Sequence, residues 1–125
     1  MALQTIRLEL ARDHDFPEGS TRRGYEFTAP LRADGHIDVE AWRAHRARCR
    51  VRRFWEGEDD EEGHLVHTRG GTWAFRYDIE GDPDDEEAGY RFDSHAFLEG
   101  EYVSIREHDG QLRTFKVASV RPSPG

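Results

Sequence analysis

The sequence predicts an α+β fold dominated by antiparallel β-structure: a small barrel or curved sheet of six to seven strands with one packed helix. Three observations support this prediction. Short segments that alternate apolar and polar residues recur along the chain, which is the period of a half-buried strand. A single segment has the spacing of an amphipathic helix. Strands and helices do not alternate in the manner that a parallel sheet requires.

The length and composition predict one domain with a small aromatic core. The chain has 125 residues, of which 35% are hydrophobic, and its net charge is −8. Three Trp, four Tyr and seven Phe compensate for the few aliphatic residues, because each aromatic ring buries a large apolar area. We expect residues 1–120 to form the domain and residues 121–125 to form a frayed tail.

The first strands are predicted near the N-terminus. Ile6, Leu8 and Leu10 share one face of an alternating segment, which is typical of a half-buried strand. Residues 13–20 contain proline and glycine and are expected to form a loop. A second strand is expected at residues 25–27.

The predicted helix begins after Gly35. Asp38 is a suitable N-cap, and the residues that follow it include several strong helix formers. Val39, Trp42, Arg46 and Cys49 fall at helical spacing and would form a narrow stripe directed inward. A further strand is expected at residues 51–55.

Two hairpins are predicted in the second half of the chain. Gly70-Gly71 is a typical two-residue hairpin turn. Counting outward from this turn places three pairs of residues opposite each other: Thr68 with Trp73, Val66 with Phe75, and His64 with Tyr77. Near the C-terminus, a three-residue loop at 108–110 places Val103 opposite Phe115 and Glu101 opposite Val117, with Gly110 in a left-handed conformation.

The last of these segments resembles known proteins. Gly100–Ile105, Asp109-Gly110 and Phe115–Val117 are similar to the closing hairpin of many small bacterial β-barrels. The resemblance covers about a fifth of the chain and is shared by peptidases, translation factors and binding modules, so it implies a fold and no activity. Taken whole, the sequence resembles small proteobacterial protein families without an assigned function, and it inherits no catalytic residue from them.

Several classes of protein are disfavoured by the sequence. The N-terminus lacks the cationic and apolar regions of a secretory signal, and no stretch approaches the length of a membrane span. Cys49 is the single cysteine, which excludes an internal disulfide and favours the cytoplasm. The negative net charge argues against nucleic acid as a partner. No cofactor motif is present, and the oligomeric state is not predicted.

Charge segregation is the clearest non-random feature. Residues 43–53 contain six arginines and no acidic residue, and residues 56–62 contain six acidic residues. One interpretation is that the acidic run, a loop like the acidic run at 78–87, folds back over the basic segment. The other is a non-catalytic protein-binding or accessory domain that captures an acidic or phosphorylated partner. The partner-binding candidates are Arg43, Arg46, Arg50, Arg52, Arg53 and Trp55.

Two alternatives remain open. Seven histidines allow a small metal-dependent enzyme, with His14, His64 and His95 as candidate ligands, although no spacing typical of a zinc site is present. A small-ligand barrel is the other alternative. In that case the cavity would be lined by Trp73, Phe75, Tyr77, Tyr90 and Phe92. Cys49 follows His45 by four residues, a spacing that a catalytic Cys/His pair on a helix could use, but we expect Cys49 to be a buried structural residue because no oxyanion site or orienting group is visible.

Overall fold

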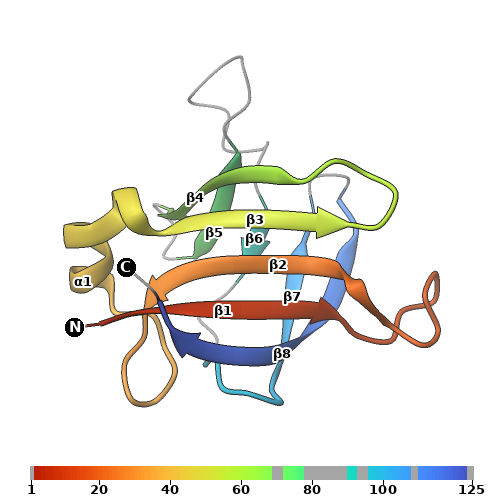
Figure 1. Ribbon diagram of the computed structural model, residues 1–125, viewed down its shortest axis with the longest axis horizontal. Coiled ribbons are helices and arrows are strands. Elements are labelled where there is room, and N and C mark those ends of the chain that lie inside the picture. Colours follow the sequence, from red (N-terminus) through yellow and green to blue (C-terminus); the bar gives the residue numbers. More distant parts are fainter. Residues whose placement is uncertain (1, 69–71, 78–89, 93–95, 108–109, 124–125) are drawn as a thin grey trace.

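The computed structural model describes residues 2–68, 72–77, 90–92, 96–107 and 110–123. Within them, eight strands pair with their neighbours in antiparallel order, and β1 also pairs with β8, which closes the sheet into a barrel (Figure 1). The predicted antiparallel α+β fold class is confirmed. The strands are β1 (Leu3–Leu10), β2 (Ser20–Pro30), β3 (Arg50–Trp55), β4 (Glu61–His67), β5 (Trp73–Tyr77), β6 (Tyr90–Phe92), β7 (Tyr102–Arg106) and β8 (Leu112–Pro122).

The interior of the barrel is filled with side chains. Ile6, Leu8 and Leu10 of β1 are buried, as their alternation predicts, and Ile6 and Leu8 lie opposite Phe27 and Tyr25 of β2. An eight-stranded barrel has an interior just wide enough for such packing. The fully buried side chains are Ile6, Leu8, Tyr25, Phe27, Leu65, Phe75, Phe97, Val103, Ile105, Phe115 and Val117.

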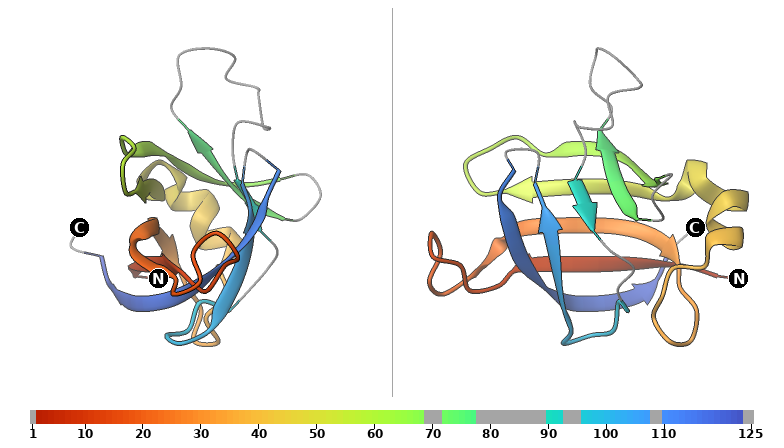
Figure 2. Two further views of the ribbon diagram at one scale, coloured as in Figure 1. Left: turned by 90° about the vertical axis from the view of Figure 1, so that its right-hand side faces the viewer. Right: turned by 180° about the vertical axis from the view of Figure 1, so that it is seen from behind.

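A short helix closes one end of the barrel. α1 spans Val39–His45, and the Asp38 side chain accepts a 2.9 Å hydrogen bond from the backbone N–H of Ala41, which confirms the predicted N-cap. The α-helix ends earlier than its apolar stripe suggests, because residues 46–48 form a 3₁₀ turn, η1 (Arg46–Arg48). The loop between β1 and β2 lies at the opposite end of the barrel from α1 (Figures 1 and 2).

The predicted register of the β4–β5 hairpin is wrong by one residue. Leu65 lies opposite Phe75, His67 opposite Trp73, and Gly63 opposite Tyr77. A one-residue slip moves every side chain of a strand to the other face of the sheet. The turn itself, Gly70-Gly71, lies outside the described residues, but the N–H of Thr68 donates to the carbonyl of Thr72 at 2.8 Å, which sets the hairpin one residue away from the predicted pairing.

The C-terminal hairpin has the predicted register. Val103 lies opposite Phe115, and the N–H of Val117 donates to the carbonyl of Glu101 at 2.8 Å. Gly110 has a φ angle of 86°, the left-handed conformation that its position in a bulged turn requires. Residues 108–109 lie outside the described residues.

The structure also bears on three other expectations from the sequence: the acidic runs, the C-terminal tail and membrane spans. Glu61 and Glu62 belong to β4, so the first acidic run is only partly a loop, whereas the run at 78–87 lies outside the described residues. Arg121 and Pro122, expected in a frayed tail, belong to β8 and pair with β1. Within the described residues, no helix is long and apolar enough to cross a lipid bilayer.

Candidate functional site

The arginine block of residues 43–53 is divided between the inside and the outside of the barrel. Arg53 is directed inward from β3, and its Nε lies 3.3 Å from Glu107 Oε2. Arg52 is directed outward, and its Nη1 donates to Asp60 Oδ2 at 3.0 Å. Because successive residues of a strand face opposite sides of the sheet, the predicted binding residues do not form one continuous surface.

The other arginines of the block lie at the α1 end. Arg43 forms a 2.9 Å ion pair with Glu40 on the exposed side of α1. Arg50 Nη1 lies 3.1 Å from His64 Nε2. Arg46 follows α1, and its guanidinium carbon lies 5.9 Å from the ring centroid of Trp42. Arg46 has no carboxylate within 4 Å among the described residues.

Trp55 lies at the opposite end, away from Arg46. Its ring packs edge-on against Phe16 with centroids 5.9 Å apart, and the Arg53 guanidinium carbon lies 4.3 Å from its centroid. Arg23 stacks on Phe16 at 4.3 Å. Trp55 therefore helps to cover the end of the barrel, and the structure does not place it beside the arginines of the α1 end.

A buried group of charges lies beneath this cover. Glu107 accepts a 2.6 Å hydrogen bond from the Tyr25 hydroxyl, and its other oxygen lies 3.1 Å from Arg113 Nε. Arg113 also pairs with Asp13 at 3.0 Å and with Asp15 at 3.2 Å. Each charge of this group faces an opposite charge, as burial requires. The group thus connects the β1–β2 loop to the core.

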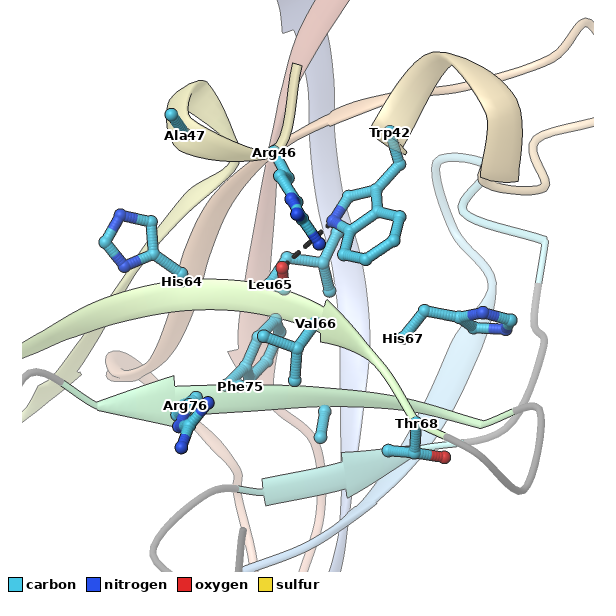
Figure 3. A pocket seen from close by; sticks show the side chains of 11 residues that line it. Trp42, Arg46, Ala47, His64, Leu65, Val66, His67, Thr68, Phe75 and Arg76 are labelled. Carbon is cyan, nitrogen blue, oxygen red and sulfur yellow. Dashed lines mark hydrogen bonds between the residues drawn. The ribbon is translucent and has the colours of Figure 1, made fainter. Parts of the chain in front are cut away.

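A pocket of about 380 Å³ opens at the other end of the molecule, between η1 and strands β4 and β5 (Figure 3). Its apolar wall is formed largely by buried residues. Leu65 and Phe75 are fully buried, and the indole N–H of Trp42 donates to the carbonyl of Leu65 at 2.9 Å, which fixes the ring against β4. The apolar lining residues are Trp42, Ala47, Leu65, Val66, Ala74 and Phe75.

The polar part of the pocket has a single sign of charge. The polar lining residues are Arg46, His64, His67, Thr68 and Arg76. Among the described residues that line the pocket there is no Asp or Glu, although the chain contains 26 of them. An apolar wall with convergent cationic groups is suited to an anionic group carried on an apolar body.

Two of the lining residues, Trp42 and His67, belong to an aromatic cluster with Trp73. The ring of His67 lies 4.5 Å from that of Trp73 and 6.1 Å from that of Trp42, measured between centroids. Trp42 and Trp73 meet edge-on at 5.4 Å. This packing depends on the observed register, which places His67 rather than His64 on the side of Trp73. His67 was not predicted at this site because the predicted register placed β4 on the wrong face of the sheet, and Arg76 was not predicted there either.

The structure does not assemble the predicted metal site. His14 lies in the β1–β2 loop, whereas His64 lines the pocket beside η1 at the opposite end, and His95 lies outside the described residues. Asp13, His14 and Asp15 do lie close together. Both carboxylates are paired with Arg113, which accounts for their proximity without a metal ion.

The remaining candidates are part of the core. Trp73, Phe75 and Tyr77 are buried, and Phe75 packs against Tyr25 and Phe27 with centroids 5.2 and 5.1 Å apart, whereas the side chains of Tyr90 and Phe92 lie outside the described residues. Cys49 is also buried, and burial raises the pKa of its thiol to about 11 despite the nearby charge of Arg48. This agrees with a structural cysteine.

The pocket therefore combines access, an apolar wall and arginine and histidine side chains, with no carboxylate among its described lining residues. Comparison with protein-family models, with curated proteins and with solved structures finds no match to this chain, so the pocket has to be interpreted from its own geometry.

Proposed function

We propose that this protein is a non-catalytic binding domain that recognises an acidic segment of a partner protein at the pocket between η1 and β4–β5. The observation that carries the proposal is the charge of the pocket: the described lining residues include two Arg and two His and no carboxylate, in a chain of net charge −8. Complementary charge promotes encounter with the correct partner and disfavours the wrong ones.

The distribution of ion pairs supports this site over the rest of the arginine block. Arg52 and Arg53 are paired with Asp60 and Glu107, so neither offers a charge to a partner without breaking an internal contact. Arg46 is exposed and stacks near Trp42. Of the predicted partner-binding residues, Arg46 is the one that lines the pocket.

The one cysteine thiol and the most deeply buried carboxylate of the described residues lie outside the pocket. Cys49 and Glu107 are both buried, and neither is among the lining residues. A binding role needs no buried nucleophile or carboxylate in the pocket, so the proposal accounts for a lining whose described ionisable side chains are arginine and histidine. The proposal includes a cytoplasmic location, in which the unpaired thiol of Cys49 stays reduced.

The proposal is tested by selecting a random dodecapeptide library on the immobilised protein at low salt. We expect enrichment of acidic peptides, and we expect their affinity to fall as salt screens the charges. Fluorescence anisotropy then measures the same peptides on Arg46→Glu and on Arg48→Glu. Both variants change the net charge equally and both positions are exposed, but Arg48 does not line the pocket.

Acidic peptides that bind Arg48→Glu normally and bind Arg46→Glu at least tenfold more weakly would support the proposal, since a tenfold change corresponds to about 1.4 kcal/mol. Enrichment without an acidic bias, or equal binding to both variants, would overturn it. A labelled oligothymidylate serves as the comparison ligand, and tighter binding of this strand than of the acidic peptides would identify a nucleic-acid-binding protein instead.

A further inference from the structure

Strand β4 extends past the end of β3, which leaves one edge of β4 without a neighbouring strand. β3 begins at Arg50, which lies opposite His64. One residue further along, the N–H of Leu65 donates to the carbonyl of Cys49 at 2.8 Å. The chain before Cys49 belongs to η1 and does not continue the strand. The part of β4 beyond Leu65 therefore has a strand, β5, on one side only.

The hydrogen bonds of the β4–β5 hairpin fix the direction of the backbone groups on this edge. The N–H of Thr68 donates to the carbonyl of Thr72. Successive residues of an antiparallel pair direct their backbone groups to alternate sides, so the N–H and C=O of His67 point away from β5, as those of Leu65 do. The carbonyl of Leu65 accepts from the indole N–H of Trp42. The backbone groups of His67 have no partner among the described residues.

The pocket lies along this edge of β4. Residues 65–68 all line it, together with Trp42 and Arg46. In Figure 3, Trp42 and Arg46 lie on one side of β4 and β5 lies on the other. The ring of His67 and the guanidinium carbon of Arg46 lie 6.1 and 5.9 Å from the centroid of the Trp42 ring. One short segment placed beside Trp42 can therefore reach both the backbone of His67 and the side chain of Arg46.

We infer that the acidic segment binds in an extended conformation along this edge: one of its residues exchanges backbone hydrogen bonds with His67, and a neighbouring carboxylate pairs with Arg46. This inference rests on the proposed function and specifies how the ligand is held. An extended chain that adds to a sheet edge gains affinity from backbone hydrogen bonds, whatever its sequence. The positive charge of Arg46, which has no carboxylate within 4 Å among the described residues, then selects an acidic segment.

Two substitutions at one position separate the backbone of His67 from its side chain. His67→Ala removes the imidazole and keeps the N–H, whereas His67→Pro also removes the N–H. Proline is accepted on a strand edge where its nitrogen faces no partner, so we expect both variants to fold, as checked by far-ultraviolet circular dichroism. The probe is fluorescein-labelled, end-capped Gly-Glu-Glu-Glu-Glu-Gly, titrated at low salt and followed by anisotropy. We expect His67→Pro to bind it about tenfold or more weakly than His67→Ala does.

Hydrogen exchange in the natural protein provides a second measurement that needs no variant. The amide of Leu65 is bonded to Cys49, so it should exchange slowly with and without the peptide. The amide of His67 should exchange rapidly in the free protein. Saturation with the peptide should slow its exchange about tenfold or more, because the new hydrogen bond has to open first. Exchange at single amides is followed by NMR, and this measurement alone decides if His67→Pro does not fold.

The outcomes separate this binding mode from the proposed function. Equal binding of the Glu peptide to His67→Ala and His67→Pro, or exchange of the His67 amide that the peptide does not slow, would overturn the backbone pairing while the acidic preference stands. A peptide with Gln in place of every Glu that binds as tightly as the Glu peptide would overturn both. Weaker binding to His67→Pro than to His67→Ala, with protection of the His67 amide by the Glu peptide, supports the inference.

Discussion

Tyr25 and Glu107 are 82 residues apart in the sequence and meet inside the barrel, where the phenol donates a 2.6 Å hydrogen bond to the carboxylate. Arg53 and Arg113 approach the same carboxylate at 3.3 and 3.1 Å. Glu107 thus connects β2, β3 and β8 at the end of the barrel that lacks the helix. Glu107 is the carboxylate that these two buried cations share, so its removal tests how much the buried charges contribute to stability.

We predict that Glu107→Gln destabilises the protein strongly. The amide keeps the size of the side chain and can accept from Tyr25, but it leaves Arg53 and Arg113 without their shared negative charge. Removal of one partner from a buried charge pair typically costs about 3–5 kcal/mol. Urea unfolding followed by tryptophan fluorescence measures the change. Glu101→Gln is the control, because Glu101 is exposed, and equal unfolding curves for the two variants would contradict the assignment.

The ionised Asp13 carboxyl should make the stability of the folded protein depend on pH in acid. Burial opposes ionisation of this carboxyl, but the N–H of Asp15 and the guanidinium of Arg113 outweigh it, so the pKa of Asp13 lies below its ordinary value of 3.8. A carboxyl with a lower pKa in the folded than in the unfolded protein stabilises the fold above the unfolded value, and this contribution is lost as the pH falls through the folded value.

We therefore expect Asp13→Asn to be less stable than the natural protein at pH 7 and to show a smaller further loss of stability below pH 4. Urea unfolding at a series of pH values measures both effects. The matched control is Asp59→Asn, which removes a charge from an exposed position. A parallel dependence on pH in the natural protein and in Asp13→Asn would show that the Asp13–Arg113 pair does not contribute to the fold in acid.

Cys49 should react only when the protein opens. Burial raises the pKa of its thiol to about 11, and at pH 8 about one such thiol in a thousand is ionised. We expect an aromatic disulfide reagent to label the native protein on the order of a hundredfold more slowly than the chain in guanidinium. Rapid labelling of the native protein would instead indicate an accessible thiolate and reopen a catalytic role for this residue.

The features that sequence predicted correctly are those that neighbouring residues determine. The N-cap at Asp38 needs only the N–H of Ala41, three residues later. The register of the C-terminal hairpin follows from one glycine in the left-handed conformation. The pairing of the buried charges could not be predicted in this way. Arg113 and Asp15 are 98 residues apart in the sequence, and no local sequence pattern indicates that they meet.

The candidate site was predictable only in part. Arg46 was identified as a partner-binding residue and does line the pocket, and His64 lines it too, although it was considered as a metal ligand. Arg76 and Val66 were missed in this role, because a two-residue turn places Val66 opposite Phe75 instead of Ala74. One residue in the connection therefore decides which side chains of β4 face the core and which face outward.

A substitution at Gly63 can distinguish the observed register of the β4–β5 hairpin from the register predicted from the sequence. In the observed register Gly63 lies opposite Tyr77, and a Cβ atom at this position would lie 2.0 Å from the backbone oxygen of Arg76. A backbone atom cannot move aside as a side chain can, so we expect Gly63→Ala to cost more than about 2 kcal/mol in unfolding free energy. Glu62→Ala, at the exposed neighbouring position, is the control. In the register predicted from the sequence, Gly63 would face outward and tolerate alanine. Similar urea midpoints for Gly63→Ala and Glu62→Ala would therefore favour the predicted register, in which Val66 does not line the pocket.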